Sequence, residues 1–166
     1  MNRKRIFLLV SGLLLVSPLL LSHWVSAKDS HSLEQIIALN ETPPGVVIEI
    51  VTGDSKGLSW ALPKSQQIIA QLRKRFPGLP VAVVTHGKEQ FALQTSKQAE
   101  QKEVHQNVKS LIGNDVQVHV CGTYAGWRGL SEEDFPDYVN VAAAGPAQIN
   151  DYIAVGYLLL VIKTPQ

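Results

Sequence analysis

The chain has 166 residues, of which 45% are hydrophobic, and 15 basic against 14 acidic side chains leave a net charge of +1. This balance, without a long basic run, argues against a nucleic-acid-binding surface. The single cysteine, Cys121, excludes an internal disulfide. We therefore expect one domain that is stabilised by its hydrophobic core, with no nucleic-acid partner and no cofactor.

Residues 1–27 have the pattern of a signal peptide. The basic run Arg3-Lys4-Arg5 precedes an apolar stretch over residues 6–21, and Val25-Ser26-Ala27 is a small-residue cleavage site. Cleavage after Ala27 leaves twelve basic and fourteen acidic residues, a net charge of −2. We expect a periplasmic or secreted protein, attached to a membrane only if this segment is kept. In an oxidising compartment an unpaired cysteine is a candidate reactive or intermolecular thiol.

The remainder of the chain predicts an N-terminal arm over residues 28–45, mobile or folded as a short helix, and an α/β domain over residues 46–166. Hydrophobic runs bounded by glycine and proline predict strands. Helical spacing of apolar residues predicts the helices, with Pro63 in the first turn of its helix. The expected strands cover residues 46–52, 79–85, 116–120, 139–143 and 157–162. The first expected helix begins near residues 59–62 and ends at residue 76, and the others cover residues 89–93, 98–112 and 146–155. This alternation is typical of a three-layer α/β/α fold with a mainly parallel sheet of about five strands.

The stretch around Cys121 organises the rest of the chain. Its valines alternate with Gln117, His119 and Cys121, so these three side chains share one face of the strand. Such a polar face indicates an edge strand, a cleft or a contact with another subunit. The residues after Cys121 can begin a helix, whose free N–H groups favour a thiolate. The alternative is that Cys121 only fills the core, as buried cysteines commonly do.

Three strand ends should meet at one edge of the sheet, because the carboxyl ends of parallel strands lie together. These strand ends carry Gly53-Asp54, His86-Gly87 and Cys121-Gly122, so a carboxylate, an imidazole and a thiol should lie at the same edge. His86 is a better partner for the thiol than His119, which lies about 6–7 Å back along its own strand. The histidines and the cysteine lack the spacing of a zinc site, so we expect no metal.

From Val46 to Ile162 the sequence resembles the DsrE/DsrF-like family of small sulfur-relay proteins. The resemblance includes Thr52-Gly53-Asp54, His86-Gly87 and Ala143-Ala144-Gly145, and it is most specific over residues 118–130. In sulfur-carrying members a strand ends in a cysteine and a short turn leads to an arginine-glycine-apolar stretch, which Cys121, Arg128, Gly129 and Leu130 match. The resemblance implies a flavodoxin-like fold, assembly as a trimer or hexamer, and a cysteine that holds a persulfide.

Two functions follow as hypotheses. In the first, the protein is an exported, sulfurtransferase-like carrier that exchanges sulfur with a donor or acceptor protein. Cys121 is the nucleophile, N–H groups near Gly122 and Thr123 stabilise the thiolate, His86 accepts a proton and Arg128 steers anions, while His119, Gly53 and Asp54 complete the site. In the second, the protein is a non-catalytic oligomeric module that binds a small ligand or a protein, and Cys121 is structural. A nucleotide-binding role is disfavoured because the glycine-rich phosphate loop is missing.

Overall fold

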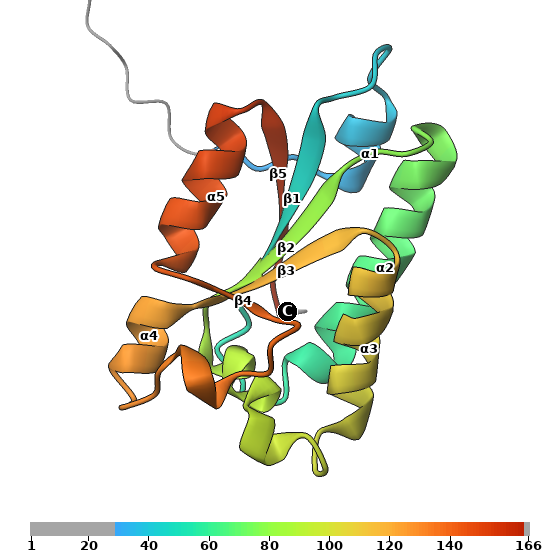
Figure 1. Ribbon diagram of the computed structural model, residues 1–166. Helices are drawn as coiled ribbons and strands as arrows, with labels where there is room; N and C mark the ends of the chain where they lie inside the picture. Colours follow the sequence, from blue (N-terminus) through green and yellow to red (C-terminus); the bar gives the residue numbers. More distant parts are fainter. Residues whose placement is uncertain (1–28, 165–166) are drawn as a thin grey trace, which may run out of the picture.

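The protein, seen in a computed structural model that describes residues 29–164, is built on one sheet of five parallel strands in the order β4-β3-β2-β1-β5 (Figure 1). The all-parallel sheet confirms the predicted fold class. The strands are β1 (Gly45–Ile50), β2 (Val81–Thr85), β3 (Val116–Cys121), β4 (Asn140–Ala142) and β5 (Tyr157–Ile162).

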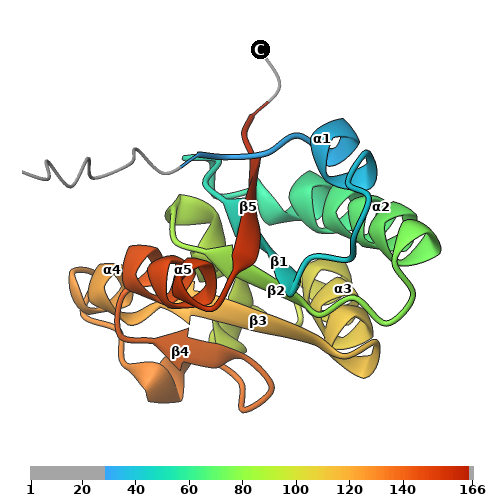
Figure 2. The same ribbon diagram turned by 90° about the horizontal axis from the view of Figure 1, so that it is seen from above.

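Helices cover both faces of the sheet and make the expected three layers. Figure 2 shows α1, α2 and α3 on one side of the sheet and α5 on the other. The α-helices are α1 (Leu33–Ile37), α2 (Leu58–Arg75), α3 (Lys102–Gly113), α4 (Gly122–Gly126) and α5 (Gly145–Ala154). The 3₁₀ helices η1 (Lys88–Leu93), η2 (Thr95–Lys97) and η3 (Glu132–Asp134) lie in the connections.

The core is divided by the sheet into a larger and a smaller part. Alternate strand residues such as Ile48 and Val83 pack with α1, α2 and α3 in the larger part. Their neighbours Val47 and Val84 pack with Ile149 of α5 in the smaller part. Both faces of β1 and β2 are therefore buried, which is why the sequences of these two strands are almost continuously apolar.

The position of Pro63 differs from the prediction. Helix α2 begins at Leu58, so Pro63 lies in its second turn and not in the first. The turn before α2 extends the helix backwards, since Gly57 N–H donates to Asp54 O and Ala61 N–H donates to Gly57 O. A proline at this position removes the hydrogen bond to the carbonyl four residues earlier, that of the exposed Ser59, which water can satisfy.

The arm before β1 contains the short helix that was one of its two predicted forms. Ser32 begins α1 with a capping box, in which its side chain and that of Gln35 each bond to the other residue's backbone N–H. Ile36 is fully buried. Upstream, Ser30 pairs with Leu159, so the arm lies along the outer edge of β5. The arm thus covers one of the two edges of the sheet.

An edge strand was one of the three explanations for the polar face of β3, and that explanation is wrong. Strand β3 lies between β2 and β4. Its polar face lies against α5, where the Tyr152 hydroxyl bonds to both Gln117 and His119. The polar residues are explained by this contact within the chain.

Other boundaries shift modestly. Helix α3 begins at Lys102 and not near residue 98, because residues 95–97 form η2 and turns follow it. The predicted signal peptide lies outside the described residues. No helix within residues 29–164 has the length and apolar character to cross a membrane.

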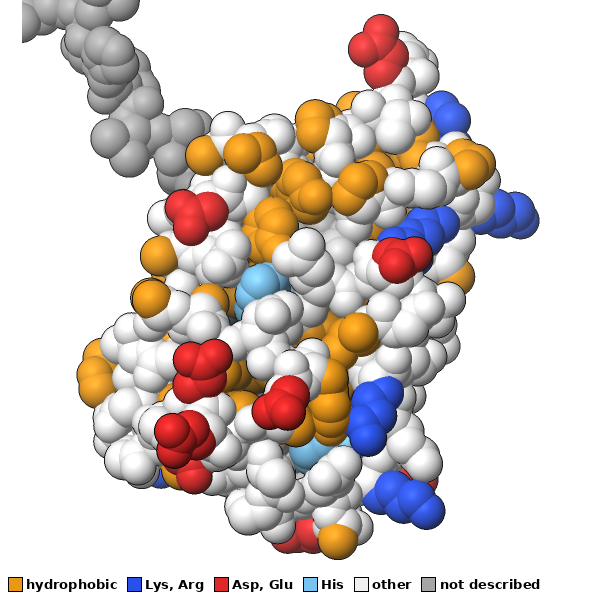
Figure 3. Space-filling model, viewed as in Figure 1, with side chains coloured by type: hydrophobic (Ala, Val, Ile, Leu, Met, Phe, Trp, Pro, Cys, Tyr) orange, Lys and Arg blue, Asp and Glu red, His pale blue; other side chains and the backbone are white. Residues whose placement is uncertain are grey.

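Charges are separated on the surface. Figure 3 shows acidic side chains at the lower left of this face, in the region of α4 and the chain that leads to β4, and basic side chains along the right, over α2 and α3. In the sequence, Glu132, Glu133 and Asp134 lie together in η3, and the last turn of α2 carries Arg73, Lys74 and Arg75. A nearly neutral chain therefore still presents locally charged surfaces.

Candidate functional site

Cys121 is the last residue of β3 and the N-cap of α4. Its Sγ accepts a hydrogen bond from the backbone N–H of Tyr124 at 3.4 Å, as an N-cap side chain does. Thr123, which we expected to help stabilise the thiolate, donates its N–H to Ala143 O instead. The Cys121 side chain is only 4% exposed. The thiol therefore has a donor suited to a developing negative charge, but little contact with solvent.

Gly122 lets α4 approach the end of β4. A Cβ at this position would lie 3.0 Å from Ala142 O and 3.3 Å from Val141 Cγ1. The Thr123 hydroxyl donates to Ala143 O at 2.7 Å. Both residues thus hold the segment after the cysteine against β4.

Glu89 is the first of two site residues that sequence reasoning missed. Its carboxylate is fully buried and accepts hydrogen bonds from Thr52 N–H and Oγ1, Thr85 Oγ1 and Gly87 N–H, at 2.8–3.1 Å. These donors lie at the carboxyl ends of β1 and β2. Hydrogen bonds of this number to a carboxylate offset the cost of burying it.

Gln90 is the second missed residue, and it binds the backbone of the cysteine. Its Oε1 accepts from Cys121 N–H at 2.8 Å and its Nε2 donates to Cys121 O at 3.2 Å. The side chain is fully buried. The sequence signal for both residues was a polar pair in an otherwise apolar short helix, directly after the His86-Gly87 strand end.

His86 lies level with Cys121, because the β2–β3 register pairs Thr85 with Val120 and each of these residues precedes one of the two. Both side chains therefore belong to the α5 face of the sheet. The imidazole Nε2 contacts Glu49 Oε1 of β1 at 2.7 Å. Within residues 29–164, no hydrogen bond joins His86 to the thiol; its polar contact is this carboxylate. Gly145, at the start of α5, packs on the ring, and a Cβ there would lie 2.6 Å from His86 Cβ.

His119 lies two residues before the cysteine on the same face and is 7% exposed. The Tyr152 hydroxyl donates to Gln117 Oε1 at 2.8 Å, so His119 Nε2 is the donor in its 2.9 Å contact with that hydroxyl. Burial lowers the pKa of His119 and raises the pKa of Tyr152. Both shifts favour the neutral form of the group, and His119 connects β3 with α5 through this contact.

Gly53 and Asp54 form the turn after β1. Gly53 has a φ of +68°, which favours glycine. Asp54 Oδ1 accepts from Lys56 N–H at 3.1 Å, so this carboxylate stabilises its own turn. The turn is connected to the rest of the edge through Thr52, which contacts both Asp54 O and Glu89.

Arg128 lies over two aromatic rings. Its guanidinium carbon is 5.6 Å from the Phe91 ring centroid and 5.7 Å from that of Tyr124, in cation–π contacts. The two rings are 5.1 Å apart. Arg128 and Phe91 line a pocket that Cys121 does not reach.

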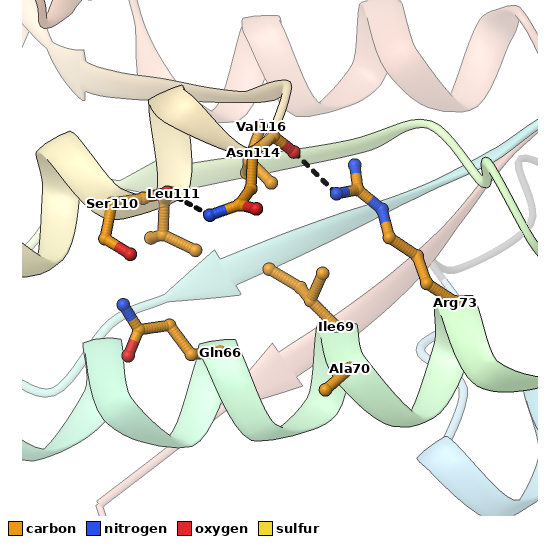
Figure 4. A pocket seen from close by; sticks show the side chains of 8 residues that line it. All are labelled: Gln66, Ile69, Ala70, Arg73, Ser110, Leu111, Asn114 and Val116. Carbon is orange, nitrogen blue, oxygen red and sulfur yellow. Dashed lines mark hydrogen bonds between the residues drawn. The ribbon is translucent and has the colours of Figure 1, made fainter.

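A second cleft, between α2 and α3, has a structural explanation. Figure 4 shows the side chain of Arg73 reaching from α2 towards the turn before β3. Its guanidinium donates to the carbonyls of Leu79, Asn114 and Asp115. These bonds join α2 to the chain before β2 and β3. Arg73 therefore has a structural role. In the described part of the chain, no three His, Cys, Asp or Glu side chains are grouped to hold a metal ion.

The site and the sheet define a class of small single-sheet α/β proteins with a cysteine at the carboxyl end of a central strand. The model of the DsrE/DsrF-like family matches residues 63–162, and the chain belongs to this family. The fold is similar to that of MTH1491 from Methanobacterium thermoautotrophicum, with a TM-score of 0.58 and 18% identity over 70% of this chain and 97% of that one. It is also similar to the ychN protein from E. coli, with a TM-score of 0.53 and 20% identity over 71% and 99%. A comparison with curated protein sequences found no significant match.

Proposed function

We propose that the protein carries sulfane sulfur on Cys121 as a persulfide. The observation that supports this most is the place of the sole cysteine, at the end of β3 with Tyr124 N–H directed at Sγ, in a chain of the DsrE/DsrF-like family. The thiolate attacks the outer sulfur of a donor R–S–SH, and a new S–S bond forms at Sγ. The donor's S–S bond breaks, its electron pair leaves on RS⁻, and RS⁻ takes up the proton that the Cys121 thiol released when it formed the thiolate.

The burial of Cys121 sets the conditions for this reaction. A side chain that is 4% exposed meets a donor only through a small reagent or a local opening. Helix α4 begins directly after Cys121, has only five residues and ends at the exposed Gly126, so we propose that it is the element that opens. The two hydrogen bonds from the Gln90 side chain keep the Cys121 backbone in place while α4 opens.

The test is intact-mass spectrometry of the full chain before and after polysulfide treatment. We expect additions of one or more sulfur atoms that map to Cys121 and are removed by a reductant. Cys121→Ser should abolish the additions and keep the circular dichroism spectrum, whereas Thr123→Ala, which keeps the thiol, should still load. Loading of the Cys121→Ser variant would disprove the mechanism.

A structural cysteine is the second candidate, favoured by the same burial. In that case the protein is a non-catalytic oligomeric module that binds a small ligand or a protein, and Cys121 only caps α4 and fills the core. The thiol would then resist both polysulfide and a small alkylating reagent until the protein is denatured. Native alkylation at a measurable rate argues for the carrier.

The proposal places the carrier outside the cytoplasm, following the pattern of residues 1–27. It also includes assembly as a trimer or hexamer and a protein that supplies or receives the sulfur. A partner or an external thiol is needed because the chain has no second cysteine to release the sulfur from Cys121.

A further inference from the structure

A pocket below the carboxyl ends of the strands is lined by three cationic side chains, Lys88, Lys97 and Arg128. Its volume is ≈ 390 Å³, which is sufficient for a small organic molecule. We call it the basic pocket. It is formed by η1, η2, the turn before α2 and the chain after α4, with residues 88–97 drawn in yellow-green at the bottom of Figure 1.

The three charges are not balanced within the pocket. No acidic residue lines it, and none of the three cations makes an ion pair with a carboxylate in the described part of the chain. Positive charges that share a pocket repel one another, and a bound anion relieves this repulsion. The whole chain has a net charge of only +1, so a generally basic composition does not explain the cluster.

Arg128 is held in a defined orientation while most of its donors stay available. The Phe91 and Tyr124 rings support its guanidinium, and Nη2 donates to the Tyr124 hydroxyl at 3.4 Å. A guanidinium has five N–H donors, and such a planar group suits phosphate or carboxylate oxygens. Supporting rings reduce the side-chain entropy that is lost when a ligand binds.

The other lining residues indicate the remaining features of the ligand. Phe91 and Leu130 offer apolar surface, and Ser55 and Gln94 offer hydrogen bonds. We propose that the basic pocket binds a small organic molecule that carries at least two acidic groups, phosphate or carboxylate, on a body that contacts Phe91. The site is separate from Cys121, which does not line the pocket, so this proposal goes beyond the sulfur-carrier function and does not depend on it.

The experiment is equilibrium dialysis of the full chain against radiolabelled inorganic pyrophosphate and, separately, radiolabelled citrate. We expect saturable binding that weakens as salt is raised, because the contacts are partly exposed charges. Binding of pyrophosphate alone identifies phosphate as the recognised group, binding of citrate alone identifies carboxylate, and each result supports the pocket. Absence of binding by both anions at millimolar concentration overturns the proposal.

Single variants test whether the anion occupies this pocket. Arg128→Gln and Lys97→Gln should each weaken binding about tenfold or more, the usual effect of losing one charged hydrogen bond. Lys88 is exposed, so Lys88→Gln is a third variant with little risk to folding. Lys102→Gln removes one equally exposed charge outside the pocket and should change the affinity less than twofold. An equal loss in Lys102→Gln would place the anion elsewhere and overturn the proposal.

Discussion

Glu89 and Gln90 hold the carboxyl ends of three strands through their side chains. Glu89 bonds to residues that follow or end β1 and β2, and Gln90 bonds to the last residue of β3. Parallel strands end in loops whose N–H and C=O groups lack sheet partners, and two buried side chains supply them here. The polar residues of η1 thus determine where the cysteine is held.

Glu89→Ala should lower the free energy of unfolding by about 3 kcal/mol or more, since each buried donor that is left unpaired costs ~1–3 kcal/mol. Urea denaturation followed by circular dichroism measures this. Glu103→Ala, at an exposed position in the first turn of α3, is the matched control and should change stability by less than about 1 kcal/mol. Similar stability of the two variants would mean that the Glu89 bonds are dispensable.

At the scale of elements, α5 packs on the smaller part of the core and contacts polar residues of β3 and the residue that follows β2. Tyr152 satisfies Gln117 and His119, and Gly145 lies against His86. The helix therefore supplies hydrogen-bond partners to the polar side chains on this face of the sheet. An apolar helix face would leave those buried groups unpaired.

Gly145→Ala should destabilise the protein by about 1–3 kcal/mol, the usual cost of overpacking, because its Cβ would overlap His86. Gly113, at the end of α3, has no atom within 4 Å of an added Cβ. Gly113→Ala should therefore range from neutral to a gain of about 1 kcal/mol. Thermal denaturation of both variants measures the contrast, and a Gly145→Ala protein as stable as Gly113→Ala would contradict the close packing of α5.

At the scale of the whole molecule, two buried histidines connect distant segments. His105 of α3 donates from Nε2 to Ala92 O and accepts at Nδ1 from the Tyr138 hydroxyl. His119 joins β3 to α5. Burial is the main cause that lowers the pKa of both imidazoles below the ordinary value of 6.5.

These lowered pKa values make stability depend on pH. Below about pH 6.5 the unfolded chain binds protons that the folded imidazoles do not, so stability is full above this pH and falls on acidification until the folded pKa is passed. In urea denaturation between pH 7.5 and 5, His105→Asn and His119→Asn should each flatten the dependence, by up to about 1.4 kcal/mol per pH unit. Slopes equal to that of the unmodified protein would show that neither histidine couples folding to protons.

The local sequence determined the elements and the fold class. Alternating and continuous apolar runs depend on neighbours one to four residues apart, so all five strands and the main helices could be predicted from them. The cysteine at a strand end with a helix after it was predicted for the same reason. The prediction for Pro63 was wrong because the turn before α2 extends the helix backwards, and this extension depends on tertiary packing.

Only the tertiary structure decided what surrounds the cysteine. Gln90 is 31 residues from Cys121 along the chain, and Glu49 is 37 residues from His86. Strand order and register bring these groups together, and neither follows from local periodicity. Burial of the thiol at 4% exposure and the meeting of three cations in the basic pocket likewise arise from how distant segments pack. The sequence by itself determined which residues are polar, and the packing of the sheet decided which of them meet.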